Sequence, residues 1–165
     1  MTETQRSRIS HCLWFGRDAE EAARFYTALL PGSRIDKVTR SPGDYPGGKA
    51  GDVLVVEFTV AGQHYIGLNG GTDVPSSNKV SLFLTCDDQA EVDRVWDAFV
   101  EAGGKPVACG WLNDRWGHTW QVVPKGCMDL LSSPDAAANA RAYAAMMTMV
   151  KLDYPKMKAA FDGAA

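Results

Sequence analysis

The sequence predicts an α+β fold made of two βαβββ repeats that form a cupped mixed sheet, followed by C-terminal helices. A strand-then-helix pattern occurs twice, 70 residues apart from Asp18 to Asp88, and internal repeats of this kind define an architecture. Short β-rich runs separated by turn residues follow each predicted helix. We expect a single domain over residues 1–165, with repeats over 9–69 and 79–124 and a helical tail over 125–165.

The first repeat opens with an apolar strand over residues 9–15. Asp18 is a candidate N-cap, and Glu21 stands three residues later, which is the spacing of a capping box. The residues that follow place apolar side chains at the spacing of an amphipathic helix, and Pro31-Gly32 ends it.

Three more strands complete the first repeat, and they are expected over residues 34–40, 53–60 and 64–68. Ala61-Gly62 joins the last two strands as a hairpin. The segment 41–51 is rich in glycine and proline, so it is expected to be a mobile loop, and residues 70–78 are expected to link the repeats.

The second repeat has the same order. A strand over residues 80–86 precedes Asp88, and Glu91 again completes a capping box. Gly103-Gly104 ends the helix. The strands that follow are expected over residues 105–112 and 119–123.

From Lys125 the pattern becomes helical. Ser133 is expected to cap a helix with Pro134 at its first position, and a final short helix is expected to end near Gly163. An apolar stripe of Met146, Met147 and Val150 needs a burying surface, which favours a homodimer.

Composition excludes several classes of function. The net charge is −3, and the 17 Lys and Arg residues are dispersed, so no nucleic-acid partner is expected. No apolar run is long enough to cross a bilayer, and the N-terminal residues 1–8 are polar and show no signal region, so we expect no membrane partner and a cytoplasmic location. The four scattered cysteines show no C-x-x-C pair and are expected to be reduced thiols.

Several phrases resemble the PhnB-like proteins: His11–Phe15, Phe25-Tyr26, Gly67–Gly71, Cys109–Leu112 and Trp116–Pro124, together with the Met-rich tail. These belong to the vicinal-oxygen-chelate superfamily of glyoxalases, bleomycin-resistance proteins and extradiol dioxygenases. The resemblance implies the glyoxalase/bleomycin-resistance fold, and it implies the demethylubiquinone methyltransferase label that such proteins often have. The turn Gly16-Arg17-Asp18 lacks the glycine-rich motif of a typical methyl-donor site.

In metal-using relatives, the resemblance implies four ligands on the first and fourth strands of the repeats. The corresponding positions are His11, Gly67, Ser81 and Gln121. Glycine offers no ligand, and one imidazole with one amide does not offset the desolvation of a divalent cation. We therefore expect no metal and no cofactor.

Strand alternation predicts one face that combines apolar and polar side chains. It could be a ligand pocket or a packed core with satisfied polar groups. Trp111 and Trp116 could cover a pocket mouth, or they could pack between the halves or across a dimer. The predicted pocket contains His11, Leu13, Tyr65, Gly67, Asn69, Ser81, Phe83, Trp111, Trp116, Thr119 and Gln121.

Two hypotheses of function follow. The first is a metal-free protein that binds a small hydrophobic or aromatic molecule. The second is an enzyme of the superfamily, either a lyase, isomerase or dioxygenase, or the methyltransferase of the family label. His11 is the one candidate catalytic residue, as a general base, although a strand histidine can equally be a hydrogen-bonded structural residue.

Overall fold

A computed structural model describes residues 9–72, 74–75 and 77–164. The polar N-terminal residues 1–8 and two positions of the predicted linker, 73 and 76, lie outside the described residues. The chain divides into two compact units, Met1–Pro75 and Ser76–Ala165.

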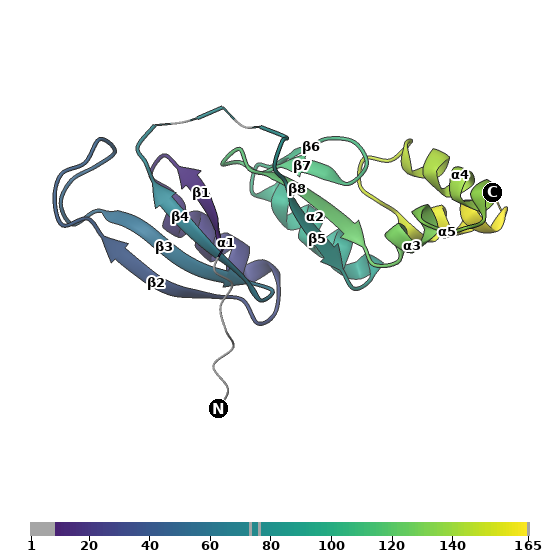
Figure 1. Cartoon of the computed structure of the whole chain (residues 1–165), viewed down its shortest axis with the longest axis horizontal. Helices are drawn as coiled ribbons and strands as arrows, with labels where there is room; N and C mark the ends of the chain where they lie inside the picture. Colours follow the sequence, from purple (N-terminus) through teal and green to yellow (C-terminus); the bar gives the residue numbers. More distant parts are fainter. Residues whose placement is uncertain (1–8, 73, 76, 165) are drawn as a thin grey trace. The chain divides into compact units, whose positions relative to one another are not determined.

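The first unit has the predicted βαβββ order. It contains β1 (His11–Phe15), α1 (Ala19–Leu29), β2 (Arg34–Arg40), β3 (Val53–Val60) and β4 (Gln63–Asn69). The sheet order is β1-β4-β3-β2, with β1 parallel to β4 and the other pairs antiparallel (Figure 1). Helix α1 packs on one face of this sheet, and no other helix occurs among the described residues of this unit to cover the opposite face.

Two turns of the first unit depend on glycine. Ala61 and Gly62 have φ angles of 46° and 84°, which is the geometry of a type I′ hairpin turn and matches the predicted connection between β3 and β4. In the 41–51 loop, Tyr45 and Gly48 exchange backbone hydrogen bonds. Gly47 lies directly against the backbone of Gly71, where a Cβ atom would not fit.

The second unit repeats the order with β5 (Leu82–Cys86), α2 (Gln89–Glu101), β6 (Lys105–Pro106), β7 (Trp111–Asn113) and β8 (Thr119–Pro124). Its sheet order is β5-β8-β7-β6, again with one parallel pair, β5 and β8. The single strand expected over 105–112 is wrong. Cys109 and Gly110 both have positive φ angles, so the chain turns there and β6 and β7 form a short hairpin.

The caps of the two repeat helices differ. Asp88 accepts a hydrogen bond from the backbone N–H of Glu91, and Glu91 bonds back to the N–H of Asp87, so this predicted cap is confirmed. Asp18 precedes α1 but its side chain makes no capping bond. The buried amide of Asn69 accepts from the N–H of Ala19 instead, 50 residues away along the chain.

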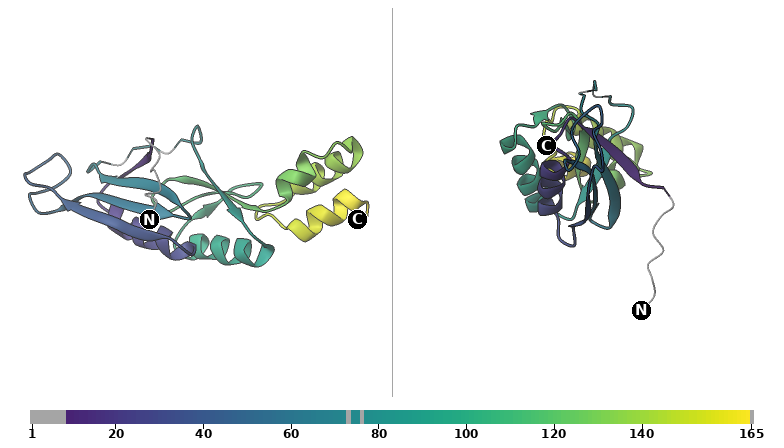
Figure 2. Two further views of the ribbon diagram at one scale, coloured as in Figure 1. Left: turned by 60° about the horizontal axis from the view of Figure 1, so that its bottom comes forward. Right: turned by 90° about the vertical axis from the view of Figure 1, so that its left-hand side faces the viewer.

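The tail contains α3 (Cys127–Leu131), α4 (Ala136–Met146) and α5 (Tyr154–Asp162). The last two lie side by side (Figure 2). The cap expected at Ser133 is wrong: Asp135 caps α4 by accepting from Ala138, while the Ser133 hydroxyl accepts from the N–H of Asp135. Gly163 ends α5 in the left-handed conformation, as predicted.

The tail shares a small core with the end of β8, formed by Val123, Cys127, Leu130, Ala142, Leu152 and Met157. Of the predicted apolar stripe, Met146 packs against this core, whereas Met147 and Val150 are each about half exposed within the chain. None of the helices in the described residues is long and apolar enough to cross a membrane.

Candidate functional site

In the first unit, the predicted pocket residues of β4 lie on the face covered by α1. The Phe58 and Tyr65 rings stack at 5.4 Å, and Tyr26 of α1 lies 6.0 Å from Phe58. Leu13 is buried and pairs in register with Gly67 on the same face. These residues therefore form the core under α1.

Gly67 and Asn69 are fixed by this packing. A Cβ atom added to Gly67 would lie 3.3 Å from the Cβ of Ala19 and 3.4 Å from the Phe15 ring, so a larger side chain would press against α1. The Asn69 side chain is almost fully buried, accepting from Ala19 and donating to the carbonyl of Val53. The oxygen and the NH2 group of the Asn69 amide are thus both used within the unit.

His11 lies at the edge of the same face. Its ring is 5.6 Å from Tyr65, and the residue is exposed. Burial raises the pKa of the Tyr65 phenol, so this group is neutral at physiological pH.

In the second unit, the predicted residues of β5 and β8 lie on the face that α2 does not cover. Trp120 packs against Phe99 of α2 at 5.0 Å, which fixes the helix side of β8. Its neighbour Gln121 therefore points to the other face, where its Nε2 donates to the Ser81 hydroxyl at 2.8 Å. Phe83, the register partner of Gln121, is half exposed.

A second group of hydrogen-bonded polar side chains lies on the same face, around Thr119. The Thr119 hydroxyl lies 2.8 Å from Oδ1 of Asn113 and 3.0 Å from Oδ1 of Asn78. One hydroxyl proton serves only one of these oxygens, so the other asparagine must turn its NH2 group towards Thr119. Asn113 and Asn78 were not predicted. Asn113 alternates with Trp111 on its strand and could have been found, but Asn78 belongs to the linker, where no periodicity exists.

The prediction of one shared face is therefore wrong. Leu13 faces the helix of its unit, whereas its counterpart Phe83 faces away from α2. Three residues, 16–18, connect β1 to α1, but only Asp87 and Asp88 connect β5 to α2. The spacing of 70 holds for the helices, while the strands are offset by 71, from Phe15 to Cys86. A shift of one residue exchanges the two faces of a strand.

The same one-residue shift affects the four positions that correspond to the metal ligands of relatives. His11 and Gly67 lie on the side of their sheet that faces α1, while Ser81 and Gln121 lie on the side of theirs that faces away from α2. With the offset of 71, the counterpart of Ser81 is Ser10. Within the described part of the chain, no three His, Cys, Asp or Glu side chains are grouped to hold a metal. The absence of a metal stays a prediction.

The four cysteines are free thiols. Burial raises the pKa of Cys86 to about 12 and that of Cys127 to about 11, and it also raises the pKa of Cys12. Because the thiolate is the reactive form, Cys86 and Cys127 are unreactive at neutral pH.

The three tryptophans on and near β8 do not form one cluster, because each has different neighbours. Trp120 is buried, and its indole N–H donates to the Asp114 carboxylate at 2.9 Å. Trp116 is partly buried and lies under the Arg115 guanidinium, 4.4 Å from its centre. Trp111 pairs in register with Gln121, so it is the tryptophan next to the polar groups on the face that α2 does not cover.

Comparison with known proteins agrees with this architecture. The model of the 3-demethylubiquinone-9 3-methyltransferase family matches residues 7–123. The PhnB protein of Bacillus cereus, which has the same methyltransferase name, is 30% identical, with 72% of this chain and 99% of that chain covered and a TM-score of 0.64. No curated protein matches the sequence.

Two more distant structures share the fold. A Pseudomonas aeruginosa protein is 21% identical, with 72% and 97% of the two chains covered and a TM-score of 0.59. The fosfomycin resistance protein FosX of Mesorhizobium loti is 14% identical, with 71% and 90% covered and a TM-score of 0.50. The chain belongs to the 3-demethylubiquinone-9 3-methyltransferase family, which includes PhnB-like proteins.

Proposed function

We propose that this protein binds a small aromatic molecule, without a metal, on the face of the second unit's sheet that α2 does not cover. The observation that supports this is the half-exposed Phe83 ring next to the hydrogen-bonded pair Gln121 and Ser81. A ring available for stacking beside fixed polar groups is the usual composition of a small-molecule site.

Within the part of the chain that the structure describes, the polar groups of this face keep hydrogen-bonding capacity for a ligand. Gln121 uses its NH2 group on Ser81, which leaves its Oε1 as an acceptor, while the Ser81 hydroxyl keeps its own proton to donate. A planar ligand on Phe83 could therefore exchange hydrogen bonds with both residues. Trp111, on the other side of Gln121, would limit the width of the site.

Of the eleven predicted pocket residues, we retain those that lie on this face, namely Ser81, Phe83, Trp111, Thr119 and Gln121. We propose structural roles for Leu13, Tyr65, Gly67 and Asn69, because they support α1. Neither His11 nor Trp116 enters the proposed site.

The test compares two exposed apolar residues of the second unit. Binding of anilinonaphthalene sulfonate, followed by its fluorescence, should weaken about 10-fold in Phe83→Ala, because one good aromatic contact contributes roughly 0.5–1.5 kcal/mol beyond its buried area. Val100→Ala is the matched control, since Val100 is 39% exposed on α2. Equal affinity of Phe83→Ala and the wild type would refute the proposal.

The alternative is a methyltransferase, which the family name and the 30% identity to the Bacillus cereus protein favour. Isothermal calorimetry with S-adenosylmethionine distinguishes the two. We expect no saturable heat, whereas one site per chain would make methyl transfer the leading function.

We further propose a homodimer located in the cytoplasm. Four free thiols are typical of a reducing compartment. The exposed Met147 and Val150 side chains of the tail are apolar surface that a second copy could bury.

A further inference from the structure

Three side chains of the first unit form a hydroxyl, imidazole and carboxylate chain. Oγ of Ser10 lies 2.9 Å from Nδ1 of His64. Nε2 of His64 lies 3.6 Å from Oε2 of Glu57. The three residues come from the segment before β1, from β4 and from β3, so only the folded sheet brings them together.

All three lie on the face of the sheet that α1 does not cover. Tyr65 and Phe58 point towards α1, so their strand neighbours His64 and Glu57 point the opposite way. The His64 side chain is 18% exposed and that of Glu57 is 29% exposed. A small molecule could therefore reach this group, while the imidazole is held on most sides.

The imidazole is oriented by its neighbours. If the Ser10 hydroxyl donates to Nδ1, the ring proton is on Nε2 and points towards the Glu57 carboxylate. Nε2 is buried and makes no hydrogen bond among the described residues, because 3.6 Å is just beyond that distance. A positive charge that develops on the ring would attract this carboxylate. The nearest cationic residue on the neighbouring strand β2 is Lys37, which is the register partner of Glu57.

A nucleophile within hydrogen-bond reach of a base that a third group orients is the arrangement that activates serine hydroxyls. Compared with the Ser-His-Asp template, the two ring nitrogens exchange roles here, because Nδ1 faces the hydroxyl. Either nitrogen can be the unprotonated, basic one, depending on the tautomer of the neutral imidazole, so Nδ1 can accept the serine proton when Nε2 carries the ring proton.

We propose that Ser10, His64 and Glu57 form a nucleophilic site that accepts acyl groups from small carboxylic esters. Oγ of Ser10 bonds to the ester carbonyl carbon while its proton passes to Nδ1 of His64. The bond to the leaving alcohol then breaks, and the alcohol takes that proton. Water cleaves the acyl-Ser10 ester by the same two steps, releasing the acid and restoring the hydroxyl.

The neighbouring side chains fit an apolar substrate. Cys12 is exposed on the same face of β1, and it pairs in register with Ile66, which is partly buried. They lie two residues further along the chain than Ser10 and His64 and therefore on the same face of the sheet. An acyl or aryl group could rest there while its carbonyl carbon approaches Ser10.

The second unit supplies an internal control. Ser81 is the counterpart of Ser10, but its hydroxyl accepts from the Gln121 amide, which is not a base. The two serines therefore occupy equivalent positions in the repeats, but only one of them has a base as its hydrogen-bond partner. Of the two, Ser10 should be nucleophilic and Ser81 should not.

The decisive experiment treats the full-length wild-type protein with a fluorophosphonate, followed by peptide mass spectrometry. We expect modification at Ser10 and none at Ser81. This result needs no variant, so it does not depend on whether a substituted chain folds. Absence of modification at Ser10, or equal modification of both serines, would overturn the proposal.

Hydrolysis of p-nitrophenyl acetate tests turnover. Ser10→Ala and His64→Gln should lower kcat at least about 100-fold, in keeping with the contribution of a positioned general base. Ser132→Ala, at an exposed serine of the tail outside both proposed sites, should leave kcat unchanged. Glu57→Gln should lower kcat without changing KM, and Glu57→Asp should restore part of it, as expected of a positioning residue. Unchanged hydrolysis in a folded Ser10→Ala variant would also overturn the proposal.

Discussion

At the scale of single residues, Asp114 organises the turn between β7 and β8. One carboxylate oxygen accepts from the backbone N–H groups of Trp116 and His118, and the other accepts from the Trp120 indole. The residue is only 5% exposed. A buried carboxylate with three donors stabilises the turn, because each bond to a charged group is worth more than a neutral one.

We expect Asp114→Ala to lower the free energy of unfolding by about 3 kcal/mol, because it leaves three donors without their acceptor in a closed turn. Urea unfolding followed by tryptophan fluorescence measures this well, since four of the five tryptophans belong to the second unit. Asp87→Ala is the control, because Asp87 is exposed and its ion pair with Lys125 is long, at 3.7 Å. Equal effects of the two variants would contradict this role.

A second residue-scale prediction concerns Gly71 in the first unit. Its φ is +85°, and an added Cβ would lie 1.9 Å from the Cα of Gly47. Gly51 has a similar φ of +89° but open space around it. Gly71→Ala should therefore destabilise by about 1–3 kcal/mol more than Gly51→Ala, the usual cost of overpacking. Urea unfolding followed by circular dichroism compares them, and equal losses would show that only φ matters.

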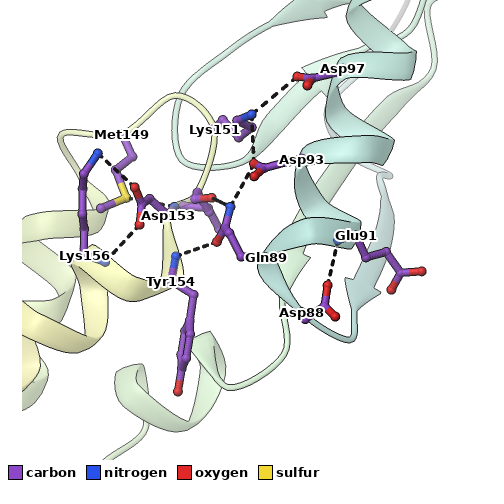
Figure 3. A network of polar contacts seen from close by, with 11 residues as sticks. Asp88, Gln89, Glu91, Asp93, Asp97, Met149, Lys151, Asp153, Tyr154 and Lys156 are labelled. Carbon is purple, nitrogen blue, oxygen red and sulfur yellow. Dashed lines mark hydrogen bonds and ion pairs between the residues drawn. The ribbon is translucent and has the colours of Figure 1, made fainter.

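At the scale of elements, the tail is joined to α2 by a polar network (Figure 3). The Gln89 amide donates to the carbonyl of Leu152 and accepts from the N–H of Tyr154. Lys151 Nζ lies 2.9 Å from Asp93 and 3.4 Å from Asp97, both on α2. The Gln89 side chain of α2 thus satisfies backbone groups of Leu152 and Tyr154, at the start of α5.

This network predicts a pH dependence. The hydrogen bond from Lys151 holds the pKa of Asp93 below its ordinary value of 3.8. Because the folded pKa is the lower one, the contribution of Asp93 is fully present above pH 3.8 and is lost as the pH falls through the folded value. The pair is partly exposed, so Asp93→Asn should cost less than about 1 kcal/mol at pH 7. The difference from the wild type should vanish in stronger acid.

Urea unfolding of both proteins between pH 7 and pH 2 measures this difference. Asp162→Asn is a control in an exposed pair within α5, with Lys158, which does not join the tail to α2. If hydrogen exchange in α5 of Asp93→Asn equals that of the wild type, Asp93 does not help to hold the tail.

At the scale of the whole molecule, the proposed homodimer is open to a direct test. Light scattering at micromolar concentration should give about twice the mass of the chain. Because Met147 and Val150 are each half exposed, Val150→Glu should shift the protein towards the monomer, while Lys158→Glu on the exposed side of α5 should not. A monomeric wild type would refute the dimer.

Several features follow from the sequence itself. The two repeats, the order of their elements, the Asp88 cap and the Ala61-Gly62 turn depend on local rules of periodicity, capping and backbone conformation. These rules act within a few residues, so they can be interpreted without knowing what the segments contact. The family resemblance relied on the same local phrases.

Which face each strand residue occupies was decided only by the tertiary structure. Strand side chains alternate with a period of two, so the one extra residue before α1 exchanged the faces of β1 and placed Leu13 under the helix instead of in a pocket. The group of Ser10, His64 and Glu57 likewise depends on the register of β3, β4 and the segment before β1. Residues 54 positions apart meet there, and no local pattern in the sequence records such a contact.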